Sequence, residues 1–176
     1  MCSSDLQQSL EHINYYNPSA GLFAVQNVQA QVAANSIETR QVFYQYDAKG
    51  NPKEFSKAND IHAVYLWSYN GEYPVVRITG STLSQVTAIV SQATLDAACT
   101  PGNDAAVRTL LQTLRSQLPG ALVSTYTYLP GVGMTSETDA RGRVTFYNYD
   151  SFQRLLSVTD NDGNIIKTYN YQYEHP

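Results

Sequence analysis

Alternation of apolar and polar residues is the main pattern in this chain, and it is typical of β-strands with one buried face. Along 143–149, Thr145, Tyr147 and Tyr149 share one face of the predicted strand, because successive strand side chains point to opposite sides. Aromatic and β-branched residues favour such pleated surfaces. The same reasoning predicts further strands over 22–32, 38–47, 54–56, 61–69, 73–79, 154–159 and 165–173.

Paired tyrosines recur along the second half of the chain at a nearly fixed step. Tyr126, Tyr147 and Tyr169 each open a Tyr-x-Tyr triplet, and the triplets stand 21 and then 22 positions apart. The turn residue Asp139 recurs at a similar step as Asp160. A fixed period of about 20–50 residues marks repeat architecture, in which each unit buries its apolar face against the next. We therefore expect an antiparallel sheet of β-hairpin repeats, with the repeated tyrosines packed on neighbouring strands.

Glycine marks the predicted turns between these strands. Asp162-Gly163 and Asn70-Gly71 lie between strand-like runs. Such pairs favour a type I′ hairpin turn, in which both central residues have a positive φ. Tyr46 precedes a corresponding tyrosine by 23 positions (46 to 69), so the first half of the chain carries a slightly longer version of the same unit.

The strand pattern is interrupted between Thr79 and Leu122 by two stretches with helical spacing. In 82–98, apolar residues recur every three or four positions, and Thr82 with Gln85 forms a capping box. In the second stretch, five apolar residues have the spacing of an amphipathic helix: Val107, Leu110, Leu111, Leu114 and Leu118. We expect this helical hairpin to cover a face or an end of the sheet, since exposed sheet edges promote aggregation. The alternative is that its apolar stripe docks on another part of the full protein.

The beginning of the chain is less regular. Residues 7–20 are expected to be irregular, and 22–32 is interpreted as a strand, with a helix as the alternative because its apolar residues also form a stripe. The start MCSSDL (Met1–Leu6) resembles the VCSSDL that a common sequencing-adapter end encodes, with a GTG start written as Met. We expect these residues to be a sequencing artefact, and the natural N-terminus with any signal peptide to lie upstream.

The tyrosine repeats resemble the YD repeat of RHS-type proteins. The family pattern is approximately Y-x-Y-D-x-x-G-R-L, then an acidic turn with glycine and a second Y-x-Y. Residues 147–155 (YNYDSFQRL), the turn at 160–163 and residues 169–171 (YNY) follow it. Gln153 stands where the family has glycine, which leaves the positive φ of that turn open. Residues 65–75 (YLWSYNGEYPV) are similar to the C-terminal ends of large secreted RHS-like proteins of Bacteroidetes-type bacteria.

The resemblance implies a segment of a large bacterial protein, secreted or at the cell surface, whose repeats wind into β-sheet ribbons and sometimes closed shells. Implied roles are cell-surface contact, polysaccharide binding or enclosure of a toxic C-terminal domain, as in the shell of a polymorphic toxin. Implied partners are the remainder of the full-length repeat protein and a cell-surface polysaccharide. The expected organisation is an irregular N-terminal segment (1–20), a first YD-like β-repeat block (21–80), a helical hairpin insertion (81–120) and a second YD-repeat block (121–176).

Composition and charge exclude several function classes. The net charge of −4 argues against nucleic-acid binding, which requires a basic patch. No apolar run approaches the roughly 18 residues of a membrane span. Fourteen tyrosines against five phenylalanines indicate sheet faces that are partly wet, because a tyrosine buries its ring while its hydroxyl reaches a partner.

No residue pattern points to catalysis, a metal or a cofactor, so we predict a non-catalytic structural or interaction segment. His12, His62 and His175 are scattered, and Cys99 has no accompanying partner pattern. Residues 160–164 fit a hairpin turn better than a calcium loop, because the glycine and glutamate of such a loop do not fall in place.

The tyrosine ladder has two interpretations. Packing between repeats is preferred, and stacking on sugar rings is the alternative. The candidates for glycan stacking are the aromatic residues Trp67, Tyr69 and Tyr73.

Overall fold

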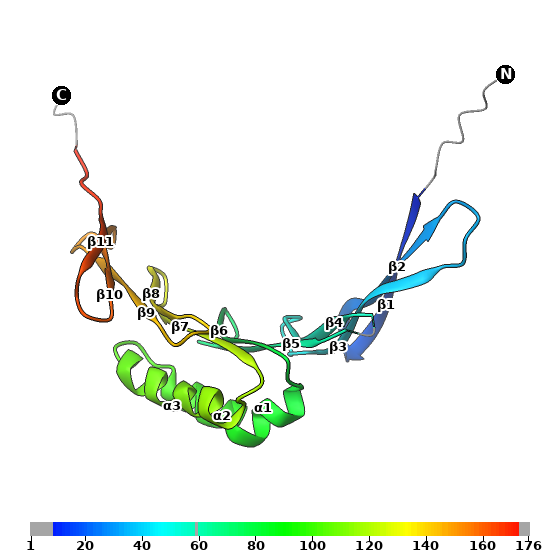
Figure 1. The fold of residues 1–176 in the computed structure, drawn as a ribbon, viewed down its shortest axis with the longest axis horizontal. Coiled ribbons are helices and arrows are strands. Elements are labelled where there is room, and N and C mark those ends of the chain that lie inside the picture. Colours follow the sequence, from blue (N-terminus) through cyan, green and yellow to red (C-terminus); the bar gives the residue numbers. More distant parts are fainter. Residues whose placement is uncertain (1–8, 59, 173–176) are drawn as a thin grey trace.

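The fold is a single antiparallel sheet whose eleven strands follow one another in sequence order (Figure 1). The computed structural model describes residues 9–58 and 60–172. Three helices are inserted between β6 and β7. The strands are β1 (Ser9–Ser19), β2 (Leu22–Val32), β3 (Glu38–Tyr46), β4 (Pro52–Lys57), β5 (His62–Ser68), β6 (Tyr73–Thr79), β7 (Leu122–Leu129), β8 (Gly133–Thr138), β9 (Val144–Tyr149), β10 (Leu155–Asp160) and β11 (Ile165–Thr168).

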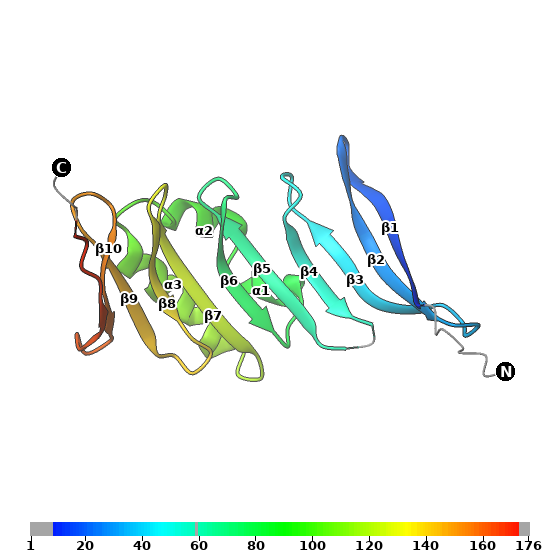
Figure 2. The ribbon, with the colours of Figure 1, turned by 90° about the horizontal axis from the view of Figure 1, so that it is seen from above.

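The sheet is curved along its length. Figure 1 shows a crescent with the helices against its convex face, and Figure 2 shows the open face with the helices behind the middle strands. One face of the sheet is therefore covered at its centre, and none of the helices in the described residues lies on the concave face.

The mainly β fold, built of antiparallel hairpins, is confirmed. The placement of the repeated tyrosines on neighbouring strands was wrong. Tyr126 lies on β7, Tyr147 on β9, and Tyr169 directly follows β11. The repeat unit is two strands long, so one strand of opposite direction lies between two successive copies of the tyrosine. The repeated tyrosines therefore fall on every second strand.

Three helices form the insertion, one more than predicted. They are α1 (Leu83–Ile89), α2 (Gln92–Ala98) and α3 (Asp104–Gln117). The capping box of Thr82 and Gln85 is present at α1. The predicted helix over 82–98 breaks at Ser91, whose side chain accepts a hydrogen bond from the backbone N–H of Thr94 and caps a new helix.

The core lies between these helices and the centre of the sheet. From the sheet, Leu66, Val76 and Ile78 are fully buried, and from α3, Leu111 and Leu114 are fully buried. The apolar stripe of α3 therefore packs on this sheet, and the alternative that it docks elsewhere was wrong. This packing supplies the hydrophobic stabilisation that a one-layer sheet lacks.

The beginning of the chain differs from the prediction. Residues 9–19 form β1, which pairs antiparallel with β2 from Ser9–Val32 to Ser19–Leu22. The expected irregular segment is thus a strand over these residues, because backbone pairing with β2 outweighs a polar composition. The strand interpretation of 22–32 is confirmed. Met1–Leu6, with its predicted artefact, lies outside the described residues.

Candidate functional surface

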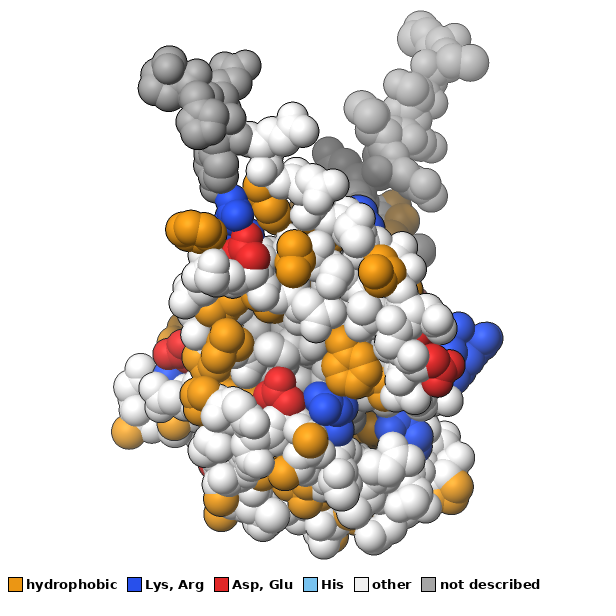
Figure 3. Space-filling view, turned by 90° about the vertical axis from the view of Figure 1, so that its left-hand side faces the viewer, with side chains coloured by type: hydrophobic (Ala, Val, Ile, Leu, Met, Phe, Trp, Pro, Cys, Tyr) orange, Lys and Arg blue, Asp and Glu red, His pale blue; other side chains and the backbone are white. Residues whose placement is uncertain are grey.

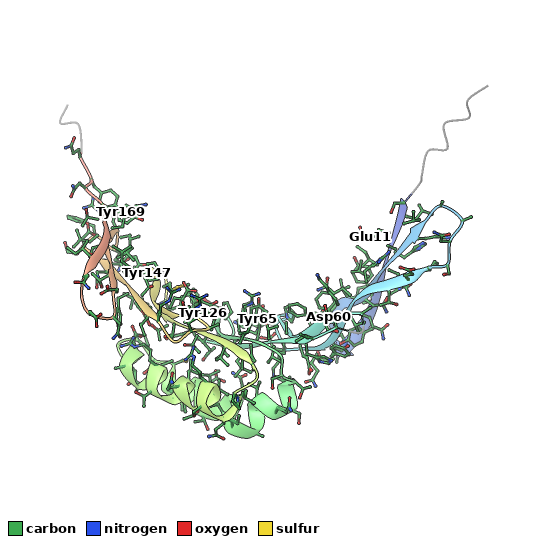
Figure 4. All side chains as sticks on the ribbon, in the orientation of Figure 1. Glu11, Asp60, Tyr65, Tyr126, Tyr147 and Tyr169 are labelled. Atoms are coloured by element: carbon green, nitrogen blue, oxygen red, sulfur yellow. The ribbon has the colours of Figure 1, made fainter. Side chains whose placement is uncertain are left out.

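The concave face carries a row of tyrosines and charged residues. In β5, Val64, Leu66 and Ser68 face the helices, so Tyr65 and Trp67 point to the opposite, concave side. Cross-strand pairing extends this face from Tyr65 to Arg77 and Ser124, and from Tyr126 to Glu137 and Thr145. Figure 4 shows the labelled Tyr65, Tyr126, Tyr147 and Tyr169 following one another along it.

Burial and nearby charges affect several tyrosines of this row. Burial raises the pKa of the Tyr126 hydroxyl, and the carboxylate of Glu137 adds to the shift. Burial likewise raises the pKa of Tyr147, with a further contribution from the carboxylate of Glu137. The ammonium of Lys167 lies 4.7 Å from the ring centre of Tyr169, within cation–π range. The carboxylate of Glu137 therefore acts on tyrosines of two successive repeats, Tyr126 and Tyr147.

Aromatic contacts continue toward the N-terminal strands. Phe55 stacks on Tyr65 with 5.8 Å between ring centres, and Phe43 lies 5.6 Å from Phe55. Tyr46 lies 5.9 Å from Phe43 and 6.3 Å from Tyr16. Aromatic pairs in this distance range contribute about 0.5–1.5 kcal/mol each beyond their burial. These contacts join β1, β3, β4 and β5.

A second set of four tyrosines forms hydrogen bonds with the strand before its own. In each case the tyrosine hydroxyl donates a hydrogen bond of 2.7–3.1 Å to a backbone carbonyl of the preceding strand. The pairs are Tyr46 with Val25, Tyr128 with Pro74, Tyr149 with Met134 and Tyr171 with Leu155. This bond gives the second tyrosine of the repeat a structural role that the sequence period alone did not reveal.

Four turns share one hydrogen-bond pattern around an aspartate. Its Oδ1 accepts from the backbone N–H groups two and four residues on, and its Oδ2 accepts from the side chain four residues on. The residue at the fourth position of each turn has a positive φ. The aspartates are Asp47, Asp139, Asp150 and Asp160, and the residues with positive φ are Gly50, Gly142, Gln153 and Gly163.

The expectations for three turns have different outcomes. Gln153 has φ 62°, so this turn keeps its left-handed residue without a glycine. At Asn70-Gly71 both residues have a positive φ, as predicted. The type I′ assignment for Asp162-Gly163 was wrong, because the turn closes between the N–H of Asp160 and the carbonyl of Asn164 and only its glycine has a positive φ. The carboxylate that holds this turn belongs to Asp160, which lies before the Asp162-Gly163 pair.

The hydrogen bonds within these turns lower the pKa of their aspartates. The side-chain amide and backbone N–H of Asn164 hold the pKa of Asp160 below its ordinary value of 3.8. The Arg154 guanidinium lowers the pKa of Asp150, and the backbone N–H and guanidinium of Arg143 lower that of Asp139. The carboxylates therefore accept bonds within the turn, and a calcium loop is not needed to explain them.

The three candidate glycan-stacking residues lie in different surroundings. Tyr69 is only 9% exposed, and its ring meets Tyr73 and Tyr128 edge-on. Burial raises the pKa of both Tyr69 and Tyr128 to about 12. Tyr73 stacks on Tyr128 at 4.7 Å, and its hydroxyl accepts the N–H of Gly131. Trp67 lines an open cleft, and Tyr69 and Tyr73 are not among the residues that line this cleft.

The remaining reactive side chains are dispersed or held in the structure. His62 Nδ1 lies 2.6 Å from the Glu54 carboxylate, and its ring stacks on Tyr44 at 4.7 Å. Cys99 is buried, which raises the pKa of its thiol. Within residues 9–58 and 60–172, no group of three or more His, Cys, Asp or Glu side chains could hold a metal ion. In the same residues, no helix has the length and apolar character to cross a membrane.

A protein-family model matches part of the chain that forms this surface. Residues 132–165, which include β8, β9, β10 and the three turns that follow these strands, match the family model described as RHS Repeat. The comparison with curated proteins gives no match. The matched residues include Asp139, Asp150, Asp160 and Tyr149, so the match covers the turns and the hydroxyl bond described above.

Two solved structures have a similar fold. One is a crystal structure of TcdB2–TccC3–Cdc42, with a TM-score of 0.57 at 14% sequence identity. The other is the Tc holotoxin pore of Photorhabdus luminescens with a TccC3 variant, with a TM-score of 0.55 at 14% identity. Each match covers 94% of this chain and 8% of the other chain, so the chain spans a small part of the length of these proteins. At this identity the likeness concerns the fold alone.

Proposed function

Because the chain contains an RHS repeat at residues 132–165, we propose that it is a non-catalytic structural segment of a larger RHS/YD-repeat protein. The observation that carries this proposal is how the repeated side chains are used. The second tyrosines bond neighbouring strands, and the turn aspartates bond their own turns. Side chains committed in this way hold a sheet in register, and they are not available as catalytic groups.

The two outer strands of the sheet support a larger assembly. β1 is eleven residues long and pairs only with β2 among the described strands, and β11 pairs only with β10. Both carry exposed apolar side chains, among them Ile13, Tyr15, Ile165 and Ile166. Figure 3, which views the molecule from its C-terminal end, shows separate hydrophobic patches between charged side chains. Unpaired strand edges of this kind pair readily with further strands, and we propose the remainder of the repeat protein as their partner.

The location follows from the same proposal. The repeat resemblance implies a secreted protein or one at the bacterial cell surface, and we propose that setting for the chain. Enclosure of a toxic domain is a second candidate role, supported by the curved sheet and by its likeness to Tc toxin chains.

Hydrogen exchange of the full-length protein tests the structural proposal. If β1 and β11 are joined to further strands, their backbone N–H groups exchange as slowly as those of the central strand β6. Fast exchange along both edges would contradict the proposal. A hydrolytic activity of the purified chain toward glycoside, ester or peptide substrates, abolished by one side-chain substitution, would contradict its non-catalytic part.

Carbohydrate binding is a further candidate function, and one observation favours it. Trp67 lines an open cleft beside amide and charged side chains, which is a composition suited to a polyhydroxylated ligand. Tyr69, being buried, does not contribute its ring faces.

A further inference from the structure

The strands β4 and β5 separate at one end and leave a cleft. Their pairing is confined to three residue pairs, from Ser56–His62 to Glu54–Val64. Beyond these, β4 pairs on with β3 as far as Pro52, while β5 pairs on with β6 as far as Ser68. Between the diverging ends lies an open cleft of about 440 Å³.

The walls of this cleft are fixed by hydrogen bonds from three elements. The indole Nε1–H of Trp67 donates to the carbonyl of Pro52 at 2.9 Å, which ties the diverging strands together. Gln92, at the start of α2, donates from Nε2 to the carbonyl of Trp67 at 2.7 Å. Asn51 donates to the carbonyl of Gly71 at 2.7 Å and joins the β3–β4 turn to the β5–β6 turn. The cleft is therefore preorganised, and part of its wall comes from the helical insertion.

The charged groups of the cleft are not equally available. Asp47 accepts three hydrogen bonds within its own turn, and Asp96 accepts from Ser68 and Gln92. By contrast, Lys53 forms no ion pair within residues 9–58 and 60–172. The Lys49 ammonium lies 3.8 Å from Glu72, and both of these side chains are about half exposed. Exposed pairs at this distance are weak, so the cleft offers two ammonium groups to a ligand.

We propose that this cleft binds an acidic saccharide, a sugar that carries a carboxylate, such as a uronic acid unit. The ammonium groups of Lys53 and Lys49 pair with the carboxylate, which forms charge-assisted hydrogen bonds. The indole of Trp67 packs against the apolar face of the sugar ring, and the amide of Asn70 and the side-chain carbonyl oxygen of Gln92 form hydrogen bonds with its hydroxyls. The proposal rests on the carbohydrate-binding candidate above and specifies its ligand; the structural role stands apart from it.

Tryptophan fluorescence tests this proposal directly, because Trp67 is the single tryptophan of the sequence. The full 176-residue chain is titrated with an oligogalacturonide and with a neutral galacto-oligosaccharide of the same length, and calorimetry repeats both titrations. We expect saturable binding of the acidic sugar, at least about tenfold tighter than that of the neutral one. The Lys53→Met variant should lose about tenfold in affinity for the acidic sugar. The matched control Lys167→Met removes a lysine beside Tyr169, away from the cleft, and should bind like the parent chain.

The other outcomes distinguish the acidic class of the ligand from carbohydrate binding in general. Equal binding of both sugars, unaffected by Lys53→Met, would overturn the acidic class and leave carbohydrate binding in place. Absence of binding in both fluorescence and calorimetry would overturn carbohydrate binding at this cleft as well. Neither result bears on the structural role, which hydrogen exchange of the two edge strands decides.

Discussion

The hydroxyl of Tyr149 occupies the space where a side chain at Gly133 would begin. This hydroxyl donates to the carbonyl of Met134 at 2.9 Å, from β9 to β8. A Cβ built on Gly133 would collide with it. The glycine therefore makes room for the bond that fastens one hairpin to the strand before it.

Gly133→Ala should consequently destabilise the fold. The methyl group would displace the Tyr149 hydroxyl, with the loss of a hydrogen bond worth about 0.5–1.5 kcal/mol and local overpacking of about 1–3 kcal/mol. We expect a decrease of about 1.5–4.5 kcal/mol in the free energy of unfolding, measured by urea denaturation. Gly120→Ala is the matched control, because a Cβ there meets nothing within 4 Å and should change stability by less than about 0.5 kcal/mol. Equal effects of the two substitutions would refute the steric explanation.

Gln153→Gly should stabilise the chain. Gln153 has φ 62°, a left-handed conformation that costs a non-glycine residue roughly 1–2 kcal/mol. Glycine removes this strain and loses part of the gain through its more flexible unfolded state. A net increase of about 0.5–1 kcal/mol in the free energy of unfolding is expected from denaturant titration. Ser151→Gly in the same turn is the control, and it should be neutral or destabilising because Ser151 has no positive φ. Stabilisation by both would assign the effect to the loop in general.

Asp160→Asn should weaken the acid dependence of stability. The pKa of Asp160 lies below 3.8 in the folded chain, chiefly because the Asn164 side chain donates to its carboxylate. A lowered folded pKa contributes stability above the unfolded value, about 3.9, and this contribution is lost as the pH falls through the folded pKa. The free energy of unfolding, followed from pH 6 downward, should therefore decline less steeply in the variant. Asp162→Asn is the control, because Asp162 joins this turn through its backbone N–H; an equal change in slope there would contradict the assignment.

Leu111→Ala should show how strongly the helices stabilise the sheet. The Leu111 side chain is fully buried in the cluster between α3 and the central strands. Truncation of such a leucine leaves a cavity and costs about 2–5 kcal/mol. Thr109→Ala on the exposed side of α3 serves as the control, with an expected change within about 0.5 kcal/mol in either direction. Thermal unfolding monitored by circular dichroism compares the two, and a loss below about 1 kcal/mol for Leu111→Ala would show that the sheet is stable without its helical cover.

The sequence by itself determined the repeat and its elements. Alternation and the tyrosine period indicated β-hairpins, and helical spacing located the insertion between β6 and β7. These features are local, because side-chain periodicity and turn chemistry depend on residues close in the chain. The same locality explains the errors. Residues 9–19 have little strand pattern of their own, and their conformation is decided by pairing with β2.

Only the tertiary structure decided which side chains meet. The hydroxyl bond from Tyr128 to Pro74 joins residues 54 positions apart, across the helical insertion. The cleft beside Trp67 combines two turns with a helix, and Tyr69 is buried in the core cluster against Tyr73 and Tyr128. A repeat period fixes the spacing of residues along the chain. The curvature of the sheet, the separation of β4 from β5 and the face that the helices cover depend on contacts between distant residues, and these determine which aromatic rings are packed and which can meet a ligand.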